Sequence, residues 1–494
     1  MSTLTTNQIS LTVLPSGRKV FPKKGERLFS VLVENGFFVS ADCGGNGKCG
    51  KCKVKLLSGK INGAEVDENG YFLSCRASLI SDLTIELLER KAEKIEAVTA
   101  PTLACEKSLA IDIGTTTLVV ALVDKNSGKI IKRIARLNPQ GSFGADIISR
   151  ISAYKKGYGK ELQSLVIGEI NDMISTIVDN SELDAVVVAN TTMLHLFAGE
   201  DPSGIGEAPF IPTFIDERDY DGRELGFNAK KVKLLPSASA YIGSDVIAGA
   251  VATGLISDKT QLLVDLGTNG ELILSTNGKF YAVSTAAGPC FEGARIECGV
   301  GGIDGAINSV KVKDGEINFT TVGGYSPCGI CGAGLIDAVA VMLENGIIDE
   351  TGAFTDDYPK ALESKVKGDK FYICESVYIS QKDIREVQTA KAAISAGIET
   401  LMMETGVSSV ENLYLAGGLG LYLNASSAVK IGLIPPRMLA ETKAVGNSAL
   451  DGAIATVTSE NALTEVRKIA TEVKVIELSS SSRFNELFVD KMFF

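Results

Sequence analysis

The chain has 494 residues, of which 45% are hydrophobic, so it can form roughly three domains of about 150 residues with cores of their own. A formal net charge of −11 leaves no broad basic face, and we expect no nucleic-acid partner. No apolar run reaches the roughly 18 residues that span a bilayer and no signal peptide is visible, so we expect a cytoplasmic protein without a membrane partner. The single histidine, His195, excludes metal sites that need two histidines.

The first 89 residues predict a small domain of the β-grasp type. Residues 8–21 alternate apolar and polar side chains around a Pro-Ser-Gly turn, which predicts a β-hairpin. Residues 26–35 carry apolar side chains at helical spacing. Residues 52–59 and 82–89 have the pattern of two further strands.

Four cysteines of this region follow the spacing C-x5-C-x2-C-x22-C. They are Cys43, Cys49, Cys52 and Cys75. Three thiolates on one glycine-rich loop and a fourth from a distant turn suit a two-iron cluster. Tetrahedral zinc is an alternative, but zinc sites usually show two C-x2-C pairs; buried thiols without metal are a third possibility. We expect a [2Fe–2S] ferredoxin-like domain over residues 1–89, which resembles plant-type ferredoxins with a longer first gap.

Beyond this domain, residues 90–107 lack sustained periodicity and predict a linker. Strands then alternate with helices, which indicates α/β layers: residues 109–124 predict two strands and residues 161–178 a helix. The layout of apolar strand, Asp, Gly, Thr and second strand returns at residues 261–276. This weak internal repeat predicts two related lobes. They would cover residues 108–258 and 259–494.

Each predicted lobe carries a glycine-threonine turn in which an aspartate closes the first strand. The two turns are Asp112-Ile-Gly-Thr-Thr-Thr117 and Asp265-Leu-Gly-Thr-Asn-Gly-Glu271. Such a turn exposes backbone N–H groups and hydroxyls to a phosphate, and the aspartate can hold water or Mg²⁺. The chain has no G-x4-G-K-[ST] motif, so the site would differ from a Walker loop. A glycine-rich α/β fold that binds no nucleotide is the alternative.

Three more segments suit the same site: a glycine-rich turn at 414–420, and small residues along predicted helices at 241–250 and 446–453. Together they resemble the acetate-and-sugar-kinase, heat-shock-chaperone and actin superfamily, which implies a two-lobed actin-like (ribonuclease H-like) ATPase domain. By this resemblance the phosphates would contact Gly114, Thr115, Thr116, Gly267, Thr268 and Asn269, and the adenosine would contact Gly417 and Gly418. Mg²⁺ and the attacking water would be held by Asp112, Asp245 and Asp265. The sequence leaves open which aspartate orients the water.

The order of ferredoxin domain, linker and ATPase resembles the reductive activators of corrinoid-dependent methyltransferases. The likeness includes NPQGSFGADIISRI (138–151), NTTMLHLFAG (190–199), AAGPCFEGARI (286–296) and CGICGAGLIDAV (328–339). It implies ATP-dependent transfer of one electron from the [2Fe–2S] cluster to Co(II) of a corrinoid protein, which regenerates Co(I). A ferredoxin- or flavodoxin-like protein of low potential would supply the electron. The methyltransferase system and the formation of a homodimer stay open.

Two other functions are compatible with the same motifs. The first is a redox-responsive nucleotide-binding module without turnover, and the second is a small-molecule kinase with an accessory ferredoxin domain. Stimulation of ATP hydrolysis by a corrinoid protein would separate the leading hypothesis from the first, and phosphorylated product from a carboxylate or sugar panel would favour the second.

Other polar residues carry weaker signals. His195 lies among apolar residues, and we expect a packed, hydrogen-bonded imidazole rather than one that faces cobalt or handles protons; a role facing the corrinoid protein stays open. Asp146 and Arg150 stand four residues apart and favour an exposed helix pair, with a place on the partner-binding surface as the alternative. Four cysteines of the second lobe sit in glycine-rich loops, where we expect ordinary thiols rather than a second metal site. They are Cys290, Cys298, Cys328 and Cys331.

Overall fold

The structure of the chain is a computed structural model. It describes residues 8–39, 41, 43–88, 96–97, 106–179, 183–255, 258–418, 422–479 and 481–494. Most of the predicted linker, residues 90–107, lies outside these ranges. The chain divides into two compact units, Met1–Ala92 with Leu137–Glu169, and Glu93–Arg136 with Ile170–Phe494. No helix within the described ranges is long and apolar enough to cross a membrane.

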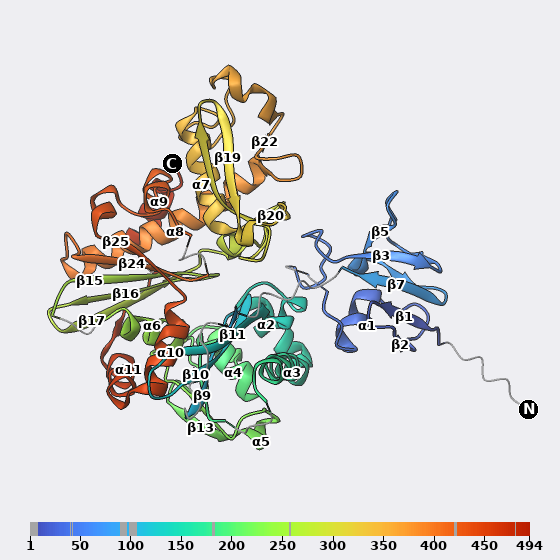
Figure 1. Ribbon diagram of the computed structural model, residues 1–494, viewed down its shortest axis with the longest axis horizontal. Coiled ribbons are helices and arrows are strands. Elements are labelled where there is room, and N and C mark those ends of the chain that lie inside the picture. Colours follow the sequence, from blue (N-terminus) through green and yellow to red (C-terminus); the bar gives the residue numbers. More distant parts are fainter. Residues whose placement is uncertain are drawn as a thin grey trace, which may run out of the picture. The chain divides into compact units, whose positions relative to one another are not determined.

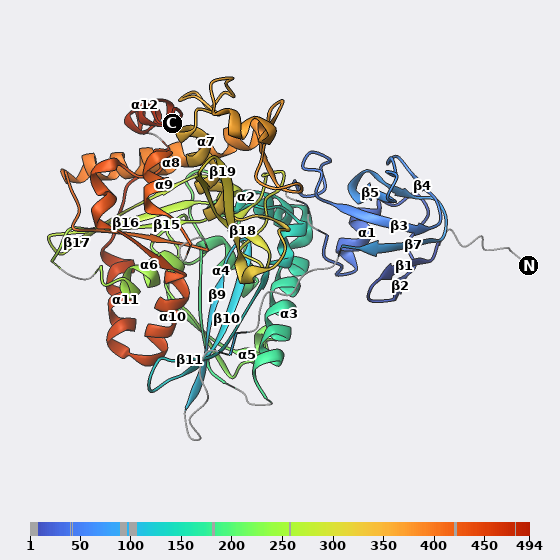
Figure 2. The ribbon, with the colours of Figure 1, turned by 45° about the horizontal axis from the view of Figure 1, so that its top comes forward.

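The first unit opens with the predicted β-grasp arrangement, a five-stranded sheet in the order β2-β1-β7-β3-β5 with helix α1 against it (Figure 2). Strand β1 pairs antiparallel with β2, as the hairpin prediction requires, and parallel with β7. Leu11 and Val13 alternate into the core, where they meet Leu28 and Leu32 of α1. The elements are β1 (Leu11–Leu14), β2 (Arg18–Val20), α1 (Leu28–Glu34), β3 (Lys53–Ser58), β4 (Ile61–Asn62), β5 (Tyr71–Leu73), β6 (Ser78–Leu79) and β7 (Leu83–Leu87).

The same unit contains helix α2 (Ile147–Ala153) and the beginning of helix α3 (Gly159–Ile177). The expected exposed pair on α2 is wrong, because Arg150 is only 1% exposed. Its guanidinium donates to the backbone oxygen of Gly144 at 3.3 Å and to Oε1 of Gln140 at 3.2 Å. Asp146 instead caps α2, where its carboxylate accepts the N–H of Ser149.

The second unit is built on two sheets with the same internal plan. The first has the strand order β13-β14-β12-β9-β10-β11-β8 and the second β25-β24-β15-β16-β17-β26. In each, a central strand (β9 or β15) pairs antiparallel with the next strand of the chain and parallel with a later one (β12 or β24). The predicted repeat of two α/β lobes is confirmed by this correspondence, and so is the actin-like fold class.

The first lobe contains β8 (Glu96–Ala97), β9 (Lys107–Ile113), β10 (Thr117–Asp124), β11 (Ile130–Leu137), β12 (Ala185–Ala189), α4 (Thr191–Ala198), β13 (Arg218–Asp221), α5 (Gly222–Leu225), β14 (Lys231–Leu234) and α6 (Ser244–Ala252). The second lobe's sheet and its helices are β15 (Gln261–Leu266), β16 (Gly270–Thr276), β17 (Lys279–Thr285), β24 (Asn412–Ala416), β25 (Thr442–Gly446), α10 (Ser448–Thr458), α11 (Glu460–Glu472) and β26 (Lys474–Val475).

Helices α6 and α10 occupy corresponding places, since each follows the last parallel strand of its sheet (Figure 1). They lie side by side between the two sheets, and one core joins apolar side chains of α6, α10 and both sheets. The contact is close because small residues line it: Gly452 of α10 lies against Ala248 of α6, and Gly249 against Ser448. The small residues noted along these segments therefore have a packing role.

The second lobe also carries an insertion with its own small sheets and the long helix α8. Its core is continuous with one face of the six-stranded sheet. Between β17 and β24 the chain forms β18 (Ala306–Lys313), β19 (Glu316–Thr321), β20 (Gly329–Ile330), α7 (Gly332–Glu344), β21 (Val366–Lys367), β22 (Lys370–Tyr372), β23 (Tyr378–Ser380) and α8 (Gln381–Thr405). Two further helices of the lobe are α9 (Ala425–Lys430), after β24, and α12 (Ser482–Asp490), after β26.

Candidate cluster-binding loop and nucleotide site

The four predicted cluster ligands lie on one loop and on the turn after β5. Cys52 and Cys75 are buried, whereas Cys43 and Cys49 are half-buried. The carbonyl of Cys52 accepts both the N–H of Ser74, at 2.9 Å, and its hydroxyl, at 3.0 Å, which fixes Cys75 beside the loop. Arg76, the residue after Cys75, also connects this turn to the loop, because its guanidinium donates to the carbonyl of Gly47 at 2.9 Å.

The glycines of the loop allow its close winding. Gly45 has a φ of 78° and lies so near Phe29 that a β-carbon would come within 2.5 Å of the ring. Burial raises the pKa of Cys43, but backbone N–H groups, those of Lys48 and Cys49 among them, outweigh it and lower the pKa to about 7. The loop thus presents N–H donors to sulfur, as an iron–sulfur loop does.

The donor set fits a [2Fe–2S] cluster. The thiols lie as two neighbouring pairs, Cys43 with Cys49 and Cys52 with Cys75, and a two-iron cluster takes two thiolates on each iron. Among the residues that the structure describes, no three His, Cys, Asp or Glu side chains converge closely enough to hold a single metal ion as they stand. Paired thiols therefore suit a cluster better than tetrahedral zinc, which needs all four at one point.

The two predicted phosphate turns lie at corresponding strand ends. Asp112 and Asp265 are the penultimate residues of β9 and β15. In the first turn the N–H of Gly114 donates to the carbonyl of Thr117 at 3.0 Å, and in the second the N–H of Gly267 donates to Asn269 at 3.1 Å. Both turns are thus narrow loops with hydroxyl side chains beside them.

One carboxylate joins these two turns. Oε2 of Glu292 accepts the hydroxyl of Thr116 at 2.9 Å, and the hydroxyl of Thr268 donates to the same oxygen. Glu292 lies 176 residues from Thr116 in sequence, so the fold brings the turns of both lobes to one anionic group. The two threonine hydroxyls thus converge on one carboxylate oxygen, and they could donate to a phosphate oxygen in its place if Glu292 moves away.

Acidic side chains crowd this place. The predicted residues Asp112, Asp245 and Asp265 are joined by Glu271 and Glu292. Burial, followed by the charges of neighbouring carboxylates, raises the pKa of Asp265 to about 8. Burial also raises the pKa of Asp112 to about 7, although a hydrogen bond from Asn447 opposes it. Neighbouring carboxyl groups with pKa values near 7 repel each other when they ionise, and a bound cation would balance their negative charge.

Further contacts connect the turns to segments distant in sequence. Nδ2 of Asn447, the residue that caps α10, donates to Oδ2 of Asp112 at 2.7 Å. Nδ2 of Asn190, which caps α4, donates to the hydroxyl of Thr115 at 3.0 Å. A β-carbon on Gly417 would lie 3.0 Å from Oδ1 of Asp265, so this glycine borders the acidic group.

The structure brings the predicted residues of the two turns, the three aspartates and Gly417 to one place, but not Gly418. Their binding of nucleotide stays a prediction. Gly418 is exposed, and a β-carbon on it would have nothing within 4 Å. The sequence interpretation missed Glu271, Glu292, Asn190 and Asn447 as site residues. All four stand in segments that had drawn attention, but their roles depend on contacts across the fold.

The weaker signals are also resolved. His195 is fully buried and hydrogen-bonded, which confirms the expected packed imidazole. Cys290 and Cys331 are buried, Cys298 is half-buried and Cys328 is exposed. Nothing in the described ranges gathers these thiols into a second metal site.

Comparison with known proteins agrees with this architecture. Residues 11–79 match the family described as a 2Fe-2S iron-sulfur cluster binding domain, residues 107–258 the RACo middle region, and residues 259–494 the C-terminal domain of RACo, the ASKHA domain. These matches define a ferredoxin domain joined to an ASKHA domain in one chain.

Relatives that match most of the chain show which family of proteins has this domain combination. The corrinoid activation enzyme RamQ of Eubacterium limosum is 32% identical over 413 residues, which cover 77% of this chain and 69% of that protein. The [Co(II) methylated amine-specific corrinoid protein] reductase of Methanosarcina barkeri is 27% identical over 429 residues, 77% of this chain and 76% of that protein. A solved reductive activator for corrinoid, iron-sulfur protein shares 28% identity and a TM-score of 0.75, with 98% of each chain covered. The chain belongs to the family of reductive activators of corrinoid proteins.

Proposed function

We propose that the chain is an ATP-dependent reductive activase. It would transfer one electron from a [2Fe–2S] cluster bound by Cys43, Cys49, Cys52 and Cys75 to Co(II) of a corrinoid protein, which becomes Co(I). A low-potential ferredoxin- or flavodoxin-like protein would then supply the next electron to the oxidised cluster. The observation that carries the ATP part is the shared contact of Thr116 and Thr268 with Glu292, because it joins the phosphate turns of both lobes. The family supports the corrinoid part.

The need for ATP follows from the energies. A plant-type [2Fe–2S] cluster has a potential of about −400 mV. Co(I) is a stronger reductant than such a cluster, and each 100 mV of uphill transfer costs roughly 2.3 kcal/mol per electron. Nucleotide binding at a place where both lobes contribute side chains can supply this free energy by changing how the lobes hold the partner.

Different residues of the site would bind the phosphates, the adenosine and the Mg²⁺ of ATP·Mg²⁺. The turns at Gly114, Thr115, Thr116, Gly267, Thr268 and Asn269 would donate to phosphate oxygens, with the Glu292 carboxylate giving up its two hydroxyl donors. Gly417 and Gly418 would face the adenosine. Asp112, Asp245 and Asp265 would hold Mg²⁺ largely through water, since they do not converge on one point and Mg²⁺ keeps several waters. Mg²⁺ would neutralise charge on the phosphates.

The proposal is tested with anaerobically purified protein and a corrinoid protein poised as Co(II). Dithionite with ATP·Mg²⁺ should convert the Co(II) absorption to that of Co(I), and ADP·Mg²⁺ or no nucleotide should not. The Cys75→Ser variant should lose the conversion but still bind ATP, whereas Asp265→Asn should keep the cluster and lose the conversion. Equal conversion with and without nucleotide would contradict the coupling. We expect the reaction to take place in the cytoplasm. A size measurement of the same preparation would show whether the protein forms a homodimer.

A further inference from the structure

Residues 199–217, called the 199–217 loop, pack over the C-terminal end of helix α4. His195 of α4 is fully buried beneath it. Nε2 of His195 accepts the backbone N–H of Thr213 at 3.1 Å and that of Phe214 at 3.3 Å. Because two donors point at Nε2, this nitrogen carries no proton, and Nδ1 donates to the carbonyl of Thr191 at 2.7 Å. The loop therefore fixes a neutral imidazole in one tautomer.

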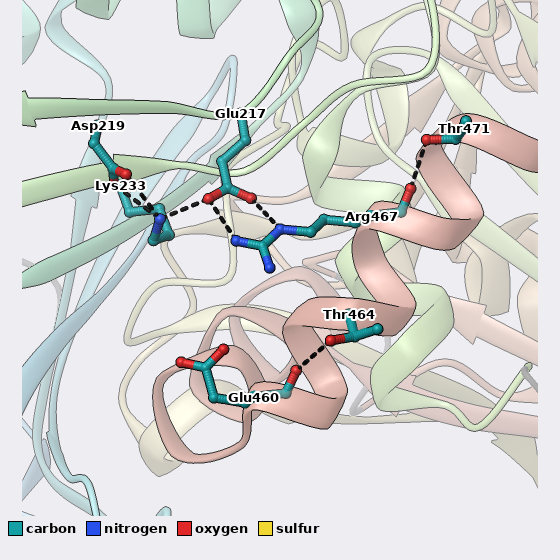
Figure 3. A network of polar contacts seen from close by, with 7 residues as sticks. All are labelled: Glu217, Asp219, Lys233, Glu460, Thr464, Arg467 and Thr471. Atoms are coloured by element: carbon teal, nitrogen blue, oxygen red, sulfur yellow. Dashed lines mark hydrogen bonds and ion pairs between the residues drawn. The ribbon is translucent and has the colours of Figure 1, made fainter.

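Other contacts hold the loop in the same place. The ring of Phe214 stacks on His195, with the ring centroids 4.3 Å apart, and the Arg218 guanidinium lies 4.0 Å from the Phe214 ring. The hydroxyl of Tyr241 donates to the carbonyl of Ile205 at 2.8 Å. The loop ends at Glu217, whose carboxylate binds Arg467 and Lys233 (Figure 3). Of these anchors only the imidazole is a fully buried titratable group.

The opposite end of α4 lies at the first phosphate turn. Asn190 caps the helix by accepting the N–H of Met193 at 3.0 Å, and the same side chain donates to Thr115. The hydroxyl of Thr191 donates to the carbonyl of Ser239 at 2.7 Å, in the segment that leads to Asp245. Helix α4 has only 8 residues and His195 is the fifth of them, so a shift at His195 is transmitted to Asn190 at the N-cap.

We propose that His195 is a positioning residue for the nucleotide site: by accepting two N–H groups of the 199–217 loop it holds α4 where Asn190 supports Thr115, and its protonation releases the loop and weakens nucleotide binding. This inference rests on the proposed binding of nucleotide at these turns. A protonated Nε2 would face two N–H donors, so the contact cannot survive protonation. The loss is expected to weaken binding on the order of ten-fold, a usual size for coupling between linked elements.

The charged groups around His195 determine the pH at which its imidazole is protonated. Burial lowers the pKa of the imidazole, Glu200 and Asp201 act against burial, and Arg218 acts with it. Because the pKa of His195 is lower in the folded protein, the unfolded chain binds the proton more readily. The contact of neutral His195 with the loop therefore stabilises the fold fully above the ordinary pKa of about 6.5. This stabilisation is lost as the pH falls through the pKa of the folded protein. Release is therefore an acid effect, and the loop is closed at neutral pH.

Two isosteric variants separate the functions of the two ring nitrogens. His195→Gln places an amide oxygen near Nε2, which keeps an acceptor for the loop and does not titrate. His195→Asn places an amide N–H near Nδ1, which keeps the donor to Thr191 and removes the acceptor. Tyr241→Phe is the control, because it removes another anchor of the loop without touching the titrating group.

The experiment measures ATP·Mg²⁺ affinity by calorimetry on the full-length protein over a pH range of about 5.5 to 8, together with amide hydrogen exchange of residues 199–217. Since the chain has one histidine, a tag-free preparation labelled at histidine gives a single imidazole NMR signal whose titration is that of His195. We expect the wild-type affinity to fall as this signal titrates. Because Asp112 and Asp265 also titrate in this range, His195→Gln should keep only the pH dependence of these carboxyls and lose less affinity in acid than wild type. His195→Asn should bind more weakly than His195→Gln at every pH, with faster exchange in the loop.

The outcomes separate this inference from the proposed function. Wild-type affinity in His195→Asn, or an acid loss in His195→Gln as large as that of wild type, would overturn the positioning role while leaving nucleotide binding intact. Tyr241→Phe should exchange faster in the loop yet keep the wild-type pH dependence, and a lost pH dependence in this variant would count against His195. A wild-type protein that binds no nucleotide at any pH would overturn both.

Discussion

Gly452 of α10 faces the carbonyl oxygen of Ala248 of α6 so closely that a β-carbon would lie 2.2 Å from that oxygen. No side chain fits this space without moving one helix. Because α6 and α10 share a core with both sheets, their separation determines how the lobes meet.

Replacement of this glycine should therefore damage the centre of the second unit. We expect Gly452→Ala to cost roughly 1–3 kcal/mol, as overpacking of a core does, and to lower the midpoint of thermal unfolding and the affinity for ATP. Gly168→Ala in α3 is the control, since a β-carbon there would have nothing within 4 Å. It should be neutral or stabilise by roughly 0.5–1 kcal/mol. Equal midpoints for the two variants would show that the helix contact is not tight.

The acidic group predicts a pH dependence of stability in the absence of nucleotide. The pKa values of Asp112 and Asp265, about 7 and about 8, lie above the ordinary 3.8. Their contribution to folding is therefore complete below pH 3.8 and is lost as the pH rises through the folded values. We expect the thermal midpoint of nucleotide-free protein to fall as the pH rises from about 4 to about 8 and to level off above that, and Mg²⁺ with ATP to reverse the fall.

Asp265→Asn tests the cause of this dependence. The variant should flatten the pH profile, because it removes one of the mutually repelling carboxylates, and should lower ATP turnover by about two orders of magnitude. Asp124→Asn is a matched control, since Asp124 lies far along β10 and hydrogen bonds lower its pKa. It should leave both the profile and the turnover unchanged. A wild-type profile that is flat over this range would mean that a cation or water already compensates the group.

Local patterns predicted much of this architecture. The cysteine loop and the two glycine-threonine turns are short conformations that their own residues specify, so the sequence was sufficient to place Asp112 and Asp265 at equivalent strand ends. The two strands over residues 109–124 and the helix over residues 161–178 were equally clear from periodicity, and they correspond to β9, β10 and α3.

Contacts between distant segments were not predictable in this way. Asn447 reaches Asp112 across 335 residues, and nothing in its local sequence distinguishes a helix cap that binds an aspartate from any other cap. Glu292 likewise follows a proline turn without periodicity, and only the fold brings it to Thr116. Arg150 shows the converse error, because a spacing typical of an exposed helix pair lies at a buried position.

The cluster loop predicts a steric requirement at Gly45. Gly45→Ala would place a β-carbon 2.5 Å from the Phe29 ring, and we expect less than about half of the wild-type iron and sulfide in the purified protein. Gly36→Ala is a matched control, because Gly36 has a similar φ of 73° with nothing within 4 Å. In both variants the alanine in a left-handed conformation destabilises the fold by about 1–2 kcal/mol, so the two variants differ only in the contact with Phe29. Equal cluster content, measured by absorption and iron analysis, would exclude a special role for Gly45.

The ion pair of Glu217 and Arg467 joins the edge of the first-lobe sheet to α11 (Figure 3). Two hydrogen bonds of 2.7 and 2.9 Å form it, and Lys233 adds a third to the same carboxylate at 2.6 Å. The Arg467 hydrogen bond, against the effect of burial, lowers the pKa of Glu217 to about 2. The network therefore stabilises the fold fully above the ordinary pKa of 4.5 and loses its effect as the pH falls toward 2.

A double-mutant cycle with Glu217→Gln and Arg467→Gln should give a coupling energy of about 1 kcal/mol near neutral pH, at the upper end of the range for exposed pairs because the contact is bidentate. The coupling should shrink in acid, where Glu217 takes up a proton, and in high salt. The Glu465 and Lys468 pair of the same helix, 3.9 Å apart, is the internal control and should give no measurable coupling. A coupling that is equal for both pairs would mean that the link between the sheet edge and α11 depends on the apolar face of α11 alone.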